Sequence, residues 1–502
     1  MSEDNVYRSQ AARWVESFRR PGRRSPLHPQ EKGLLVVLCI HLCFLPWALG
    51  TMHVWSQLVS LFLGFVGFRI ALRPRVYGRE LGGGEEPFRL TMWPKLARFP
   101  IFWIGLALLV YILVQAFNPW WGFVQNAKYW WLVRMTDIPW LPAGIEAPFK
   151  QFDAWRQMII YAGVLLPVCS VWVGMTRRRS LRILLTVIAV NAFALGAVVA
   201  FQHVTGTVRA IWPLGELTDE PVTGSFIYGN HTGAYLALAA FSAIGLATWY
   251  ADHGRRALSK STPTGVLALG ALFLGASVLL TLSRGAGVSL GVGLLIFAAW
   301  YLVRRKVRPM PSAANPRVTT LVVLVFIVFA LSTFWHLDFS AVYNRFDAMA
   351  TERSHEASVH SRILAREAAW EMLGDHWVRG VGAGGFQYLF PEYVKRYPEI
   401  YDHGNLFWEH AHCDWLEIPI ELGLVGDLLI LAAAGWWAAG SLRRGTLWNP
   451  IVVPLLIGCL QTLIHAGFDF PFQCPAILAT WCILVAIAGR WAEIEGGEEV
   501  GI

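Results

Sequence analysis

Charged residues are scarce in this 502-residue sequence: Asp, Glu, Lys and Arg together make up 15% of it, and hydrophobic residues make up 55%. Soluble globular chains carry about a quarter charged residues, so the composition excludes an ordinary soluble protein of this length. Cysteine is also rare, with seven residues. Five of them fall inside apolar runs and are expected to be inert. Cys413 and Cys474 stand at predicted helix ends on one side, where a disulfide is chemically possible.

Further absences narrow the class of protein. No basic stripe interleaves with exposed aromatic residues, so the formal net charge of +8 does not indicate nucleic-acid binding. The first apolar run follows a long basic segment and ends without a small-residue cleavage site, so we do not expect a cleavable signal peptide. We find no internal repeat and no low-complexity tract beyond the short tails.

What the sequence does contain is a series of apolar runs of roughly 18–25 residues, the length of a helix that crosses about 30 Å of hydrocarbon. They predict an all-α polytopic membrane protein with about twelve transmembrane helices. The predicted spans are residues 33–50, 53–72, 100–117, 157–175, 181–202, 229–250, 264–281, 285–303, 318–336, 414–439, 450–467 and 474–490. We expect a single membrane domain (32–490) between a basic tail (1–31) and a C-terminal tail (491–502).

Lys and Arg gather in the N-terminal tail and in alternate loops, and the positive-inside rule therefore predicts that both termini are cytoplasmic. The long loop 337–413 is then extracytoplasmic, and loops of this length tend to be functional. Its helical periodicity predicts a helix from about Ser358 to Leu373, ended by Gly374. The glycine-rich run Gly380–Phe386 lacks the strand and helix of a dinucleotide fold, so we expect a tight turn that returns the loop over the membrane.

The most informative segment runs from His410 to Gly426, at the mouth of the tenth predicted span. Asp414, Glu417 and Glu421 fall at i, i+3 and i+7, on one face of a helix. An acid that faces lipid costs about 2.5–3.5 kcal/mol or more, so these carboxylates must face protein or water. Asp414 has a structural explanation as an acid in the first turn of the helix. Glu417 and Glu421 could orient His412 or hold an arginine, and a purely structural role is equally open.

His412 stands where the long loop enters that span. A neutral imidazole near pH 7 accepts a proton from a hydroxyl and so activates it as a nucleophile. The alternative is an interfacial histidine that only hydrogen-bonds the helix end. His410 and His412, with His403 and Glu409, are also metal-ligand types, but their spacing matches no standard ligand pattern.

Three arginines are candidates for binding an anion. Arg284 interrupts the apolar sequence between the seventh and eighth spans, on the side where basic anchors are unusual. Its planar fork suits a diphosphate. Arg362 and Arg366 lie four residues apart and share one face of the helix predicted in the long loop. Asn230 and Asp469 are predicted on the same side of the membrane and could line one substrate site with them.

These segments resemble the O-antigen ligase and polymerase superfamily. The ligase signature is His, then Asn, Ser or Gln, nine residues, Gly, two residues, then Gly, Thr or Tyr. It is similar to His412, Cys413, nine residues, Gly423, two residues and Gly426, with Cys413 as the departure. The turn SRGA resembles the family's first essential arginine at Arg284, and HSRILAREAAW resembles its second at Arg362. The segments GSFIYGNHTGAYLALA and HAGFDFPFQCPA are also similar, so the resemblance covers roughly residues 190 to 490.

The resemblance implies a GT-C type membrane glycosyltransferase that needs no metal or other cofactor and acts at the periplasmic face of the bacterial inner membrane. Its donor would be a glycan on undecaprenyl diphosphate, and its acceptor a hydroxyl of the lipid A–core. By analogy His412 would be the base, while Arg284 and Arg362 hold the departing diphosphate. Arg366, Asn230, His410, Glu417 and Asp469 are the candidate substrate-binding residues.

Three alternatives stay open. A polymerase would extend repeats on a second lipid carrier, and a protein O-oligosaccharyltransferase would use a Ser or Thr hydroxyl as acceptor. A transporter would use the acids Glu417, Glu421 and Asp427 as a proton relay. The charged groups crowd one face of the predicted membrane domain instead of crossing it, and this favours a transferase.

Overall fold

The computed structural model describes residues 26–78, 81, 87–149, 151–207, 222–256, 262–308, 328, 359–401 and 408–500. In this part of the chain nine helices are long and apolar enough to cross a membrane, and two more, α9 and α16, are apolar but shorter. The eleven are α2 (Pro29–Trp47), α3 (Val54–Ala71), α5 (Pro100–Phe117), α6 (Ala154–Gly174), α7 (Arg178–Thr205), α8 (Gly229–Arg256), α9 (Thr264–Leu280), α10 (Arg284–Val307), α15 (Asp414–Arg443), α16 (Val452–His465) and α17 (Pro475–Val500). The predicted all-α polytopic fold is confirmed; the predicted span 318–336 lies outside the described residues, apart from residue 328.

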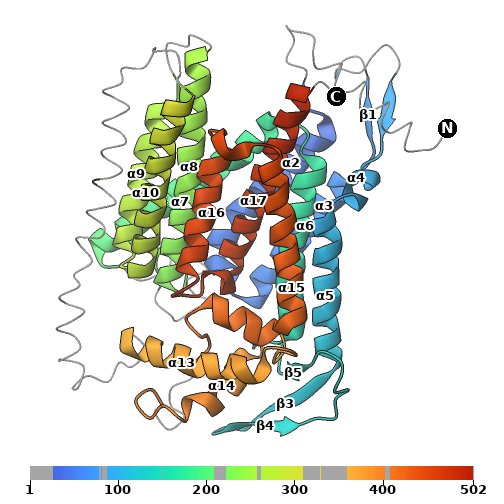
Figure 1. Ribbon diagram of the computed structural model, residues 1–502, viewed down its shortest axis with the longest axis vertical. Helices are drawn as coiled ribbons and strands as arrows, with labels where there is room; N and C mark the ends of the chain where they lie inside the picture. Colours follow the sequence, from blue (N-terminus) through green and yellow to red (C-terminus); the bar gives the residue numbers. More distant parts are fainter. Residues whose placement is uncertain are drawn as a thin grey trace.

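The helices form one bundle in which glycines allow close packing (Figure 1). Phe241 of α8 packs against Gly293 of α10 and Gly458 of α16. A Cβ at Gly458 would lie 2.6 Å from the Phe241 Cβ, so a larger residue would separate these helices. Small residues serve this purpose in membranes because lipid tails compete with every apolar helix contact.

Short elements cover the two ends of the bundle. At the end of the bundle where α2 begins, β1 (Arg75–Tyr77) pairs with β2 (Phe88–Leu90), and α4 (Trp93–Ala97) follows (Figure 1). At the other end lie the sheet β4-β3-β5, made of β3 (Pro119–Gln125), β4 (Trp130–Arg134) and β5 (Gly144–Glu146), and the helices α13 (Val359–His376) and α14 (Phe386–Val394). Three short 3-10 helices, η1 (Leu49–Thr51), η5 (Thr446–Trp448) and η6 (Pro471–Gln473), cap bundle helices. The strands were not predicted, because their Trp-rich segments are also typical of membrane interfaces.

The predicted end of the loop helix at Gly374 is wrong. Helix α13 continues to His376, and the left-handed residue that follows it is Gly380, with φ 71°. The N–H of Gly380 donates to the carbonyl of His376 at 2.8 Å. Many helices end at a left-handed residue, and the sequence offers several glycines here, so local pattern alone did not select the right one.

The glycine-rich turn docks onto a break in α15. Gly423 has φ 61° and ψ −172°, a region open essentially to glycine alone, so the helix is interrupted there. The N–H groups of Val381 and Gly382 donate to the carbonyls of Ile420 and Glu421 at 2.8 and 3.0 Å. The break therefore leaves its carbonyls paired, as a break inside a membrane protein requires. This crossing fixes the loop against the end of the bundle; that the Gly380–Phe386 turn returns the loop over the membrane stays a prediction.

Candidate functional site

His412 is held in an unusual backbone conformation just before α15. Its φ is 50°, in the left-handed region that costs a non-glycine residue about 1–3 kcal/mol unless its surroundings enforce it. The ring lies edge-on to Trp408 and to Phe470, with centroid distances of 5.6 and 4.9 Å. The side chain is 13% exposed. Nδ1 of His412 is buried and has no hydrogen-bond partner among the described residues.

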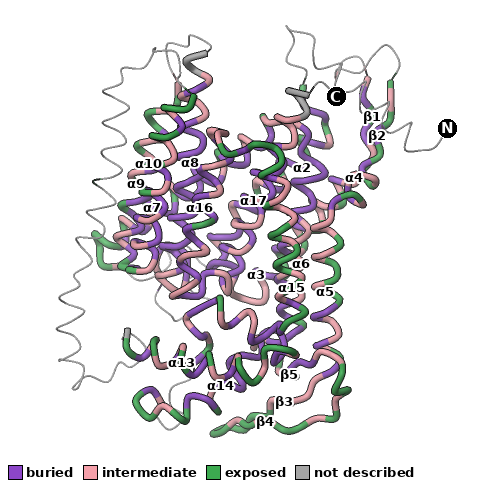
Figure 2. The backbone as a smooth tube through the Cα atoms, in the orientation of Figure 1, coloured by how far each residue is buried: buried purple, intermediate pink, exposed green. Residues whose placement is uncertain are grey.

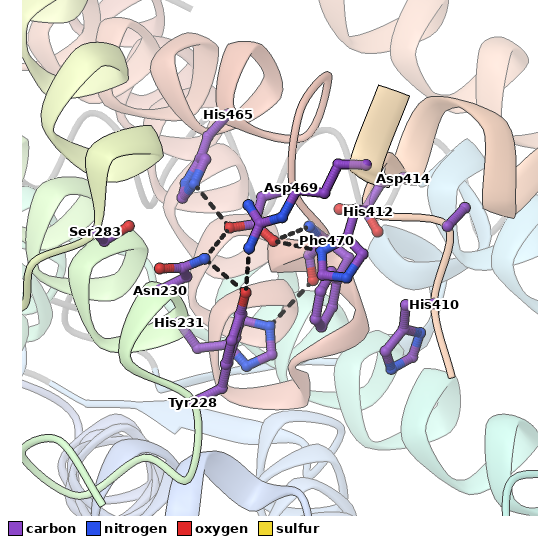
Figure 3. A network of polar contacts seen from close by, with 12 residues as sticks. Tyr228, Asn230, His231, Ser283, His410, His412, Asp414, His465, Asp469 and Phe470 are labelled. Carbon is purple, nitrogen blue, oxygen red and sulfur yellow. Dashed lines mark hydrogen bonds and ion pairs between the residues drawn. The ribbon is translucent and has the colours of Figure 1, made fainter. Parts of the chain in front are cut away.

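Asp469 is the centre of the polar cluster beside His412. It lies in the turn between α16 and α17 and is 2% exposed. Its Oδ1 lies 3.8 Å from Nδ1 of His412, and its Oδ2 lies 3.5 Å from Nε2 of His465 (Figure 3). The 3.8 Å separation exceeds a hydrogen bond, as is common before a substrate binds. Burial alone would raise the pKa of Asp469, but His412 and His465 lower this pKa well below its ordinary value.

A hydrogen-bonded series connects Asp469 to an arginine of α13. Asn230, at the start of α8, donates through Nδ2 to Oδ2 of Asp469 at 2.6 Å and to the hydroxyl of Tyr228 at 2.7 Å. The same hydroxyl accepts a hydrogen bond from Arg362 at 3.3 Å. Burial, followed by the charge of Asp469, raises the pKa of Tyr228 to about 12, so the hydroxyl stays neutral. The predicted residues Asn230, Asp469, Arg362 and His412 therefore meet in one place.

Phe470 is the aromatic centre of the same site. The Tyr228 ring stacks on it at 5.2 Å between centroids and the His410 ring at 4.4 Å. Its carbonyl lies 3.2 Å from Nε2 of His231, which is buried. Phe470 thus fixes the relative positions of both loop histidines and of the hydroxyl that Arg362 contacts.

The acidic stripe of α15 fastens the segment that carries His412. Glu417 accepts from the N–H of Ala411 at 2.8 Å, and its other oxygen lies 2.7 Å from Nδ1 of His410. Burial would lower the pKa of His410, but the Glu417 carboxylate outweighs burial and raises it. Asp414 accepts from the N–H of Phe472 at 2.9 Å. Both oxygens of Glu417 and one of Asp414 are therefore engaged within the protein.

Glu421, one turn further along α15, forms a similar contact. Its Oε1 accepts a hydrogen bond from the N–H of Phe386, at the start of α14, at 3.3 Å. Asp414, Glu417 and Glu421 each accept a hydrogen bond from a neighbouring loop or helix start, and these bonds hold those segments in place. The carboxylate next to His412 comes from Asp469 instead.

The two remaining candidate arginines lie at the edge of the cluster. Arg284 is the first residue of α10, is exposed, and has no hydrogen bond or ion pair with the described residues. A Cβ on the next residue, Gly285, would lie 2.7 Å from Nε2 of His465, so the start of α10 abuts the Asp469 cluster. Arg366 is half-buried on α13, and its buried Nε has no hydrogen-bond partner in the part of the chain that the structure describes; burial lowers the pKa of Arg366.

The cysteines and the metal-ligand types give two further observations. Cys413 and Cys474 are both free thiols, and the Cys474 thiol donates to the carbonyl of Gly50 at 3.3 Å. Among the described residues, no group of three or more His, Cys, Asp or Glu side chains is placed so that it could bind a metal ion. His403 lies outside the described residues.

Sequence reasoning missed Tyr228 and Phe470, and it did not assign His465 to the site. Each stands within four residues of a predicted site residue, in the segments FIYGNH and HAGFDF. That proximity was the available signal, but aromatic residues are so frequent in this chain that it did not distinguish these two.

The fold and the site define a polytopic membrane protein with a His–Asp–Arg cluster at one end of its helix bundle. Residues 269–431 match the family model described as O-antigen ligase. The matched segment runs from α9 into α15, and the match supports membership of the O-antigen ligase superfamily and a membrane enzyme of the ligase and polymerase type. His412, Arg284 and Arg362 lie inside the matched segment, whereas Asn230 and Asp469 lie outside it. No curated protein matches the chain.

Proposed function

We propose that this protein is a glycosyltransferase that moves a glycan from undecaprenyl diphosphate to an acceptor hydroxyl, with the lipid A–core as the preferred acceptor. The observation that carries the proposal is the position of His412. Its Nδ1 is buried, lies 3.8 Å from Oδ1 of the buried Asp469 carboxylate and has no hydrogen bond to a described residue, so Nε2 is the nitrogen left for the acceptor. A carboxylate that orients one imidazole nitrogen leaves the other correctly placed to accept a proton.

The reaction needs one base and one anion site. His412 Nε2 takes the proton of the acceptor hydroxyl, and the hydroxyl oxygen forms a bond to the anomeric carbon. The bond between that carbon and the diphosphate breaks, and its electron pair leaves with the diphosphate. Attack opposite the leaving group inverts the anomeric configuration. Because a polyprenyl diphosphate is already a good leaving group, the base and a charge clamp suffice without a metal.

Arg362 and Arg284 are the proposed charge clamp. Arg362 donates one N–H to Tyr228, and its Nε has no hydrogen-bond partner among the described residues, so donors remain for a phosphate oxygen. Arg284 has no partner among the described residues and begins α10, whose N-terminal amides also favour an anion. Arg366 supports them from the same face of α13. A lipid-borne donor also accounts for a site at the end of a transmembrane bundle.

The orientation follows from the charge distribution. We place the end with α13, α14 and the sheet in the periplasm and the basic loops and both termini in the cytoplasm. The enzyme then acts in the bacterial inner membrane on donors that have already been moved across it.

The test uses a host whose own copy is replaced by the His412→Ala variant. Undecaprenyl-linked glycans and core-linked glycans are extracted and sized. Long chains left on the carrier with bare core indicate a ligase, and single repeats without long polymer indicate a polymerase. Exposed His203, in the last turn of α7, supplies the matched control His203→Ala. A normal pattern in the His412→Ala host, at equal protein level, overturns the proposal.

A further inference from the structure

The hydroxyl of Tyr228 lies between two groups that donate hydrogen bonds to it. Nδ2 of Asn230 lies 2.7 Å from the hydroxyl oxygen (Figure 3), and a terminal nitrogen of Arg362 lies 3.3 Å from it. A guanidinium has five N–H donors and no acceptor, so the contact with Arg362 has only one direction. The hydroxyl oxygen is the acceptor in that contact.

The orientation of the Asn230 amide fixes the direction of the second contact. The same Nδ2 atom lies 2.6 Å from Oδ2 of Asp469, which is ionised and has no hydrogen to offer. Turning the amide over would place its carbonyl oxygen against a carboxylate oxygen, and two acceptors without a hydrogen between them repel each other. Nδ2 therefore gives one hydrogen to Asp469 and the other to the Tyr228 oxygen.

Both acceptor positions of the Tyr228 oxygen are thereby filled, and its own hydrogen is left over. Within the described ranges of the chain, the hydroxyl makes these two hydrogen bonds and donates none. Burial, followed by the charge of Asp469, raises the pKa of Tyr228 to about 12, so the hydrogen stays on the oxygen at neutral pH. The two N–H groups also polarise the O–H bond and strengthen it as a donor.

The Tyr228 ring is held in place by its neighbours. It stacks on Phe470 with 5.2 Å between centroids, and the His231 ring meets it edge-on at 5.0 Å. Its backbone carbonyl accepts from the N–H of His231 at 3.0 Å, at the start of α8. A donor in a fixed position needs little reorganisation when negative charge develops beside it.

Arg362 offers further donors at the same place. Figure 2 shows buried and exposed residues alternating along α13, and Arg362 is half-buried between the two faces. One of its N–H groups contacts Tyr228, while its Nε has no hydrogen-bond partner among the residues described. Tyr228 is half-buried as well. An anion is the group that accepts from a guanidinium and from an O–H together.

We infer that Tyr228 is a further catalytic residue, whose hydroxyl donates a hydrogen bond to a phosphate oxygen of the diphosphate that Arg362 binds. This inference rests on the proposed function, because that function supplies the diphosphate. As the bond between the anomeric carbon and the diphosphate breaks, the electron pair moves onto the phosphate oxygens, and a preorganised donor stabilises the added charge. Tyr228 keeps its hydrogen throughout. Asn230, which contacts both Tyr228 and Asp469, sets this donor against the base.

The test measures binding of undecaprenyl diphosphate, and separately glycan transfer, by the full-length protein in nanodiscs. Tyr228→Phe keeps the ring on Phe470 and removes the hydroxyl. It should bind undecaprenyl diphosphate about ten-fold more weakly and lower transfer about 100-fold, because the donor matters most when the charge develops. The matched control is Tyr397→Phe, which removes a hydroxyl that donates to Glu371 of the same helix α13 at 2.8 Å. It should behave like wild type.

A second variant separates donation by Tyr228 from mere support of Arg362. A ring-fluorinated tyrosine at position 228, while neutral, is a stronger hydrogen-bond donor and a weaker acceptor than tyrosine. At pH 6 the inference predicts tighter binding of undecaprenyl diphosphate than in wild type. Equal or weaker binding means that the hydroxyl serves only as an acceptor for Arg362 and Asn230, and this overturns the inference. The fluorinated residue keeps both contacts, so it also decides the question if Tyr228→Phe does not fold.

Binding requires no turnover, so this test and the test of the proposed function fail separately. Binding by folded Tyr228→Phe that equals wild type overturns the inference and leaves the His412→Ala result intact. Normal transfer by His412→Ala overturns the proposed function, and the binding measurements still report whether Tyr228 and Arg362 hold a diphosphate.

Discussion

The Nδ1 atom of His412 lies 3.8 Å from Oδ1 of Asp469. His412 precedes α15 and Asp469 follows α16, so the two residues are 57 positions apart in the sequence. Asp469 is fixed from the opposite side by Asn230, so the carboxylate cannot follow the histidine if it moves. The pair therefore has one fixed member and one adjustable member. When the histidine ring turns toward this fixed carboxylate, Nδ1 is directed to the carboxylate and Nε2 is left for the substrate.

Asp469→Asn should lower transfer by about 100-fold or more, because the amide can present an N–H to His412 and stabilise the wrong tautomer. The fold should persist, since the amide oxygen can still accept from Asn230 at the Oδ2 position and only the contact to the N–H of Phe470 is lost. Glycan transfer in membranes at matched protein level measures the effect.

The control for this variant is Asp427→Asn, which changes a half-buried acid of α15 away from the cluster. Transfer should stay near wild type. If Asp427→Asn abolishes function while Asp469→Asn is active, a proton relay through the membrane replaces the base mechanism.

Arg362→Lys should reduce transfer by at least about ten-fold even though it keeps the charge. A lysine supplies one compact ammonium and cannot contact both Tyr228 and a phosphate oxygen in the geometry of the guanidinium fork. The expected signature is a raised KM for the lipid donor. Arg396→Lys, in an exposed pair with Glu371, is the matched control and should behave like wild type. Unchanged KM in Arg362→Lys would remove this arginine from the donor site.

Local patterns were sufficient to predict the bundle and the acidic stripe. Transmembrane helices follow from apolar length, because every backbone group in lipid must be paired within its own segment. The one-sided stripe of Asp414, Glu417 and Glu421 follows from helical periodicity, and all three are buried. These properties depend on neighbours within a few residues, so one sequence reveals them.

The pairing inside the site could not be predicted in the same way. Which carboxylate lies next to His412 depends on how the start of α15 packs against the turn after α16. In the sequence, the three acids of the stripe are all nearer to His412 than Asp469 is. The break at Gly423 was equally hidden, since a helical pattern continues through it and only the docking of Gly380–Phe386 makes it stable. Both features are set by tertiary contacts between distant segments.

Gly423→Ala should destabilise the protein by on the order of 1–3 kcal/mol, because φ 61° with ψ −172° is strained for any residue with a Cβ. The Cβ would also lie 2.6 Å from the N atom of Gly380. A lower melting temperature in detergent is the expected readout. Gly435→Ala in the same helix meets no atom within 4 Å and should be neutral or slightly stabilising. Equal melting temperatures for Gly423→Ala and wild type would mean that α15 is unbroken.

The contact between His410 and Glu417 should make stability depend on pH. Folding raises the pKa of His410 through the Glu417 carboxylate, so the folded state holds the proton more tightly than the unfolded chain. The contact therefore contributes fully below the ordinary histidine pKa of about 6.5 and is lost as pH rises through the higher folded value. The melting temperature of wild type should exceed that of Glu417→Gln by roughly 2–4 °C more at pH 6 than at pH 9. Glutamine at position 410 cannot take up the proton. In a His410→Gln background, the effect of Glu417→Gln on the melting temperature should therefore be the same at pH 6 and at pH 9. A difference between wild type and Glu417→Gln that is constant across this range would mean that His410 stays neutral, and Glu417 would then hold the segment before His412 through the N–H of Ala411 alone.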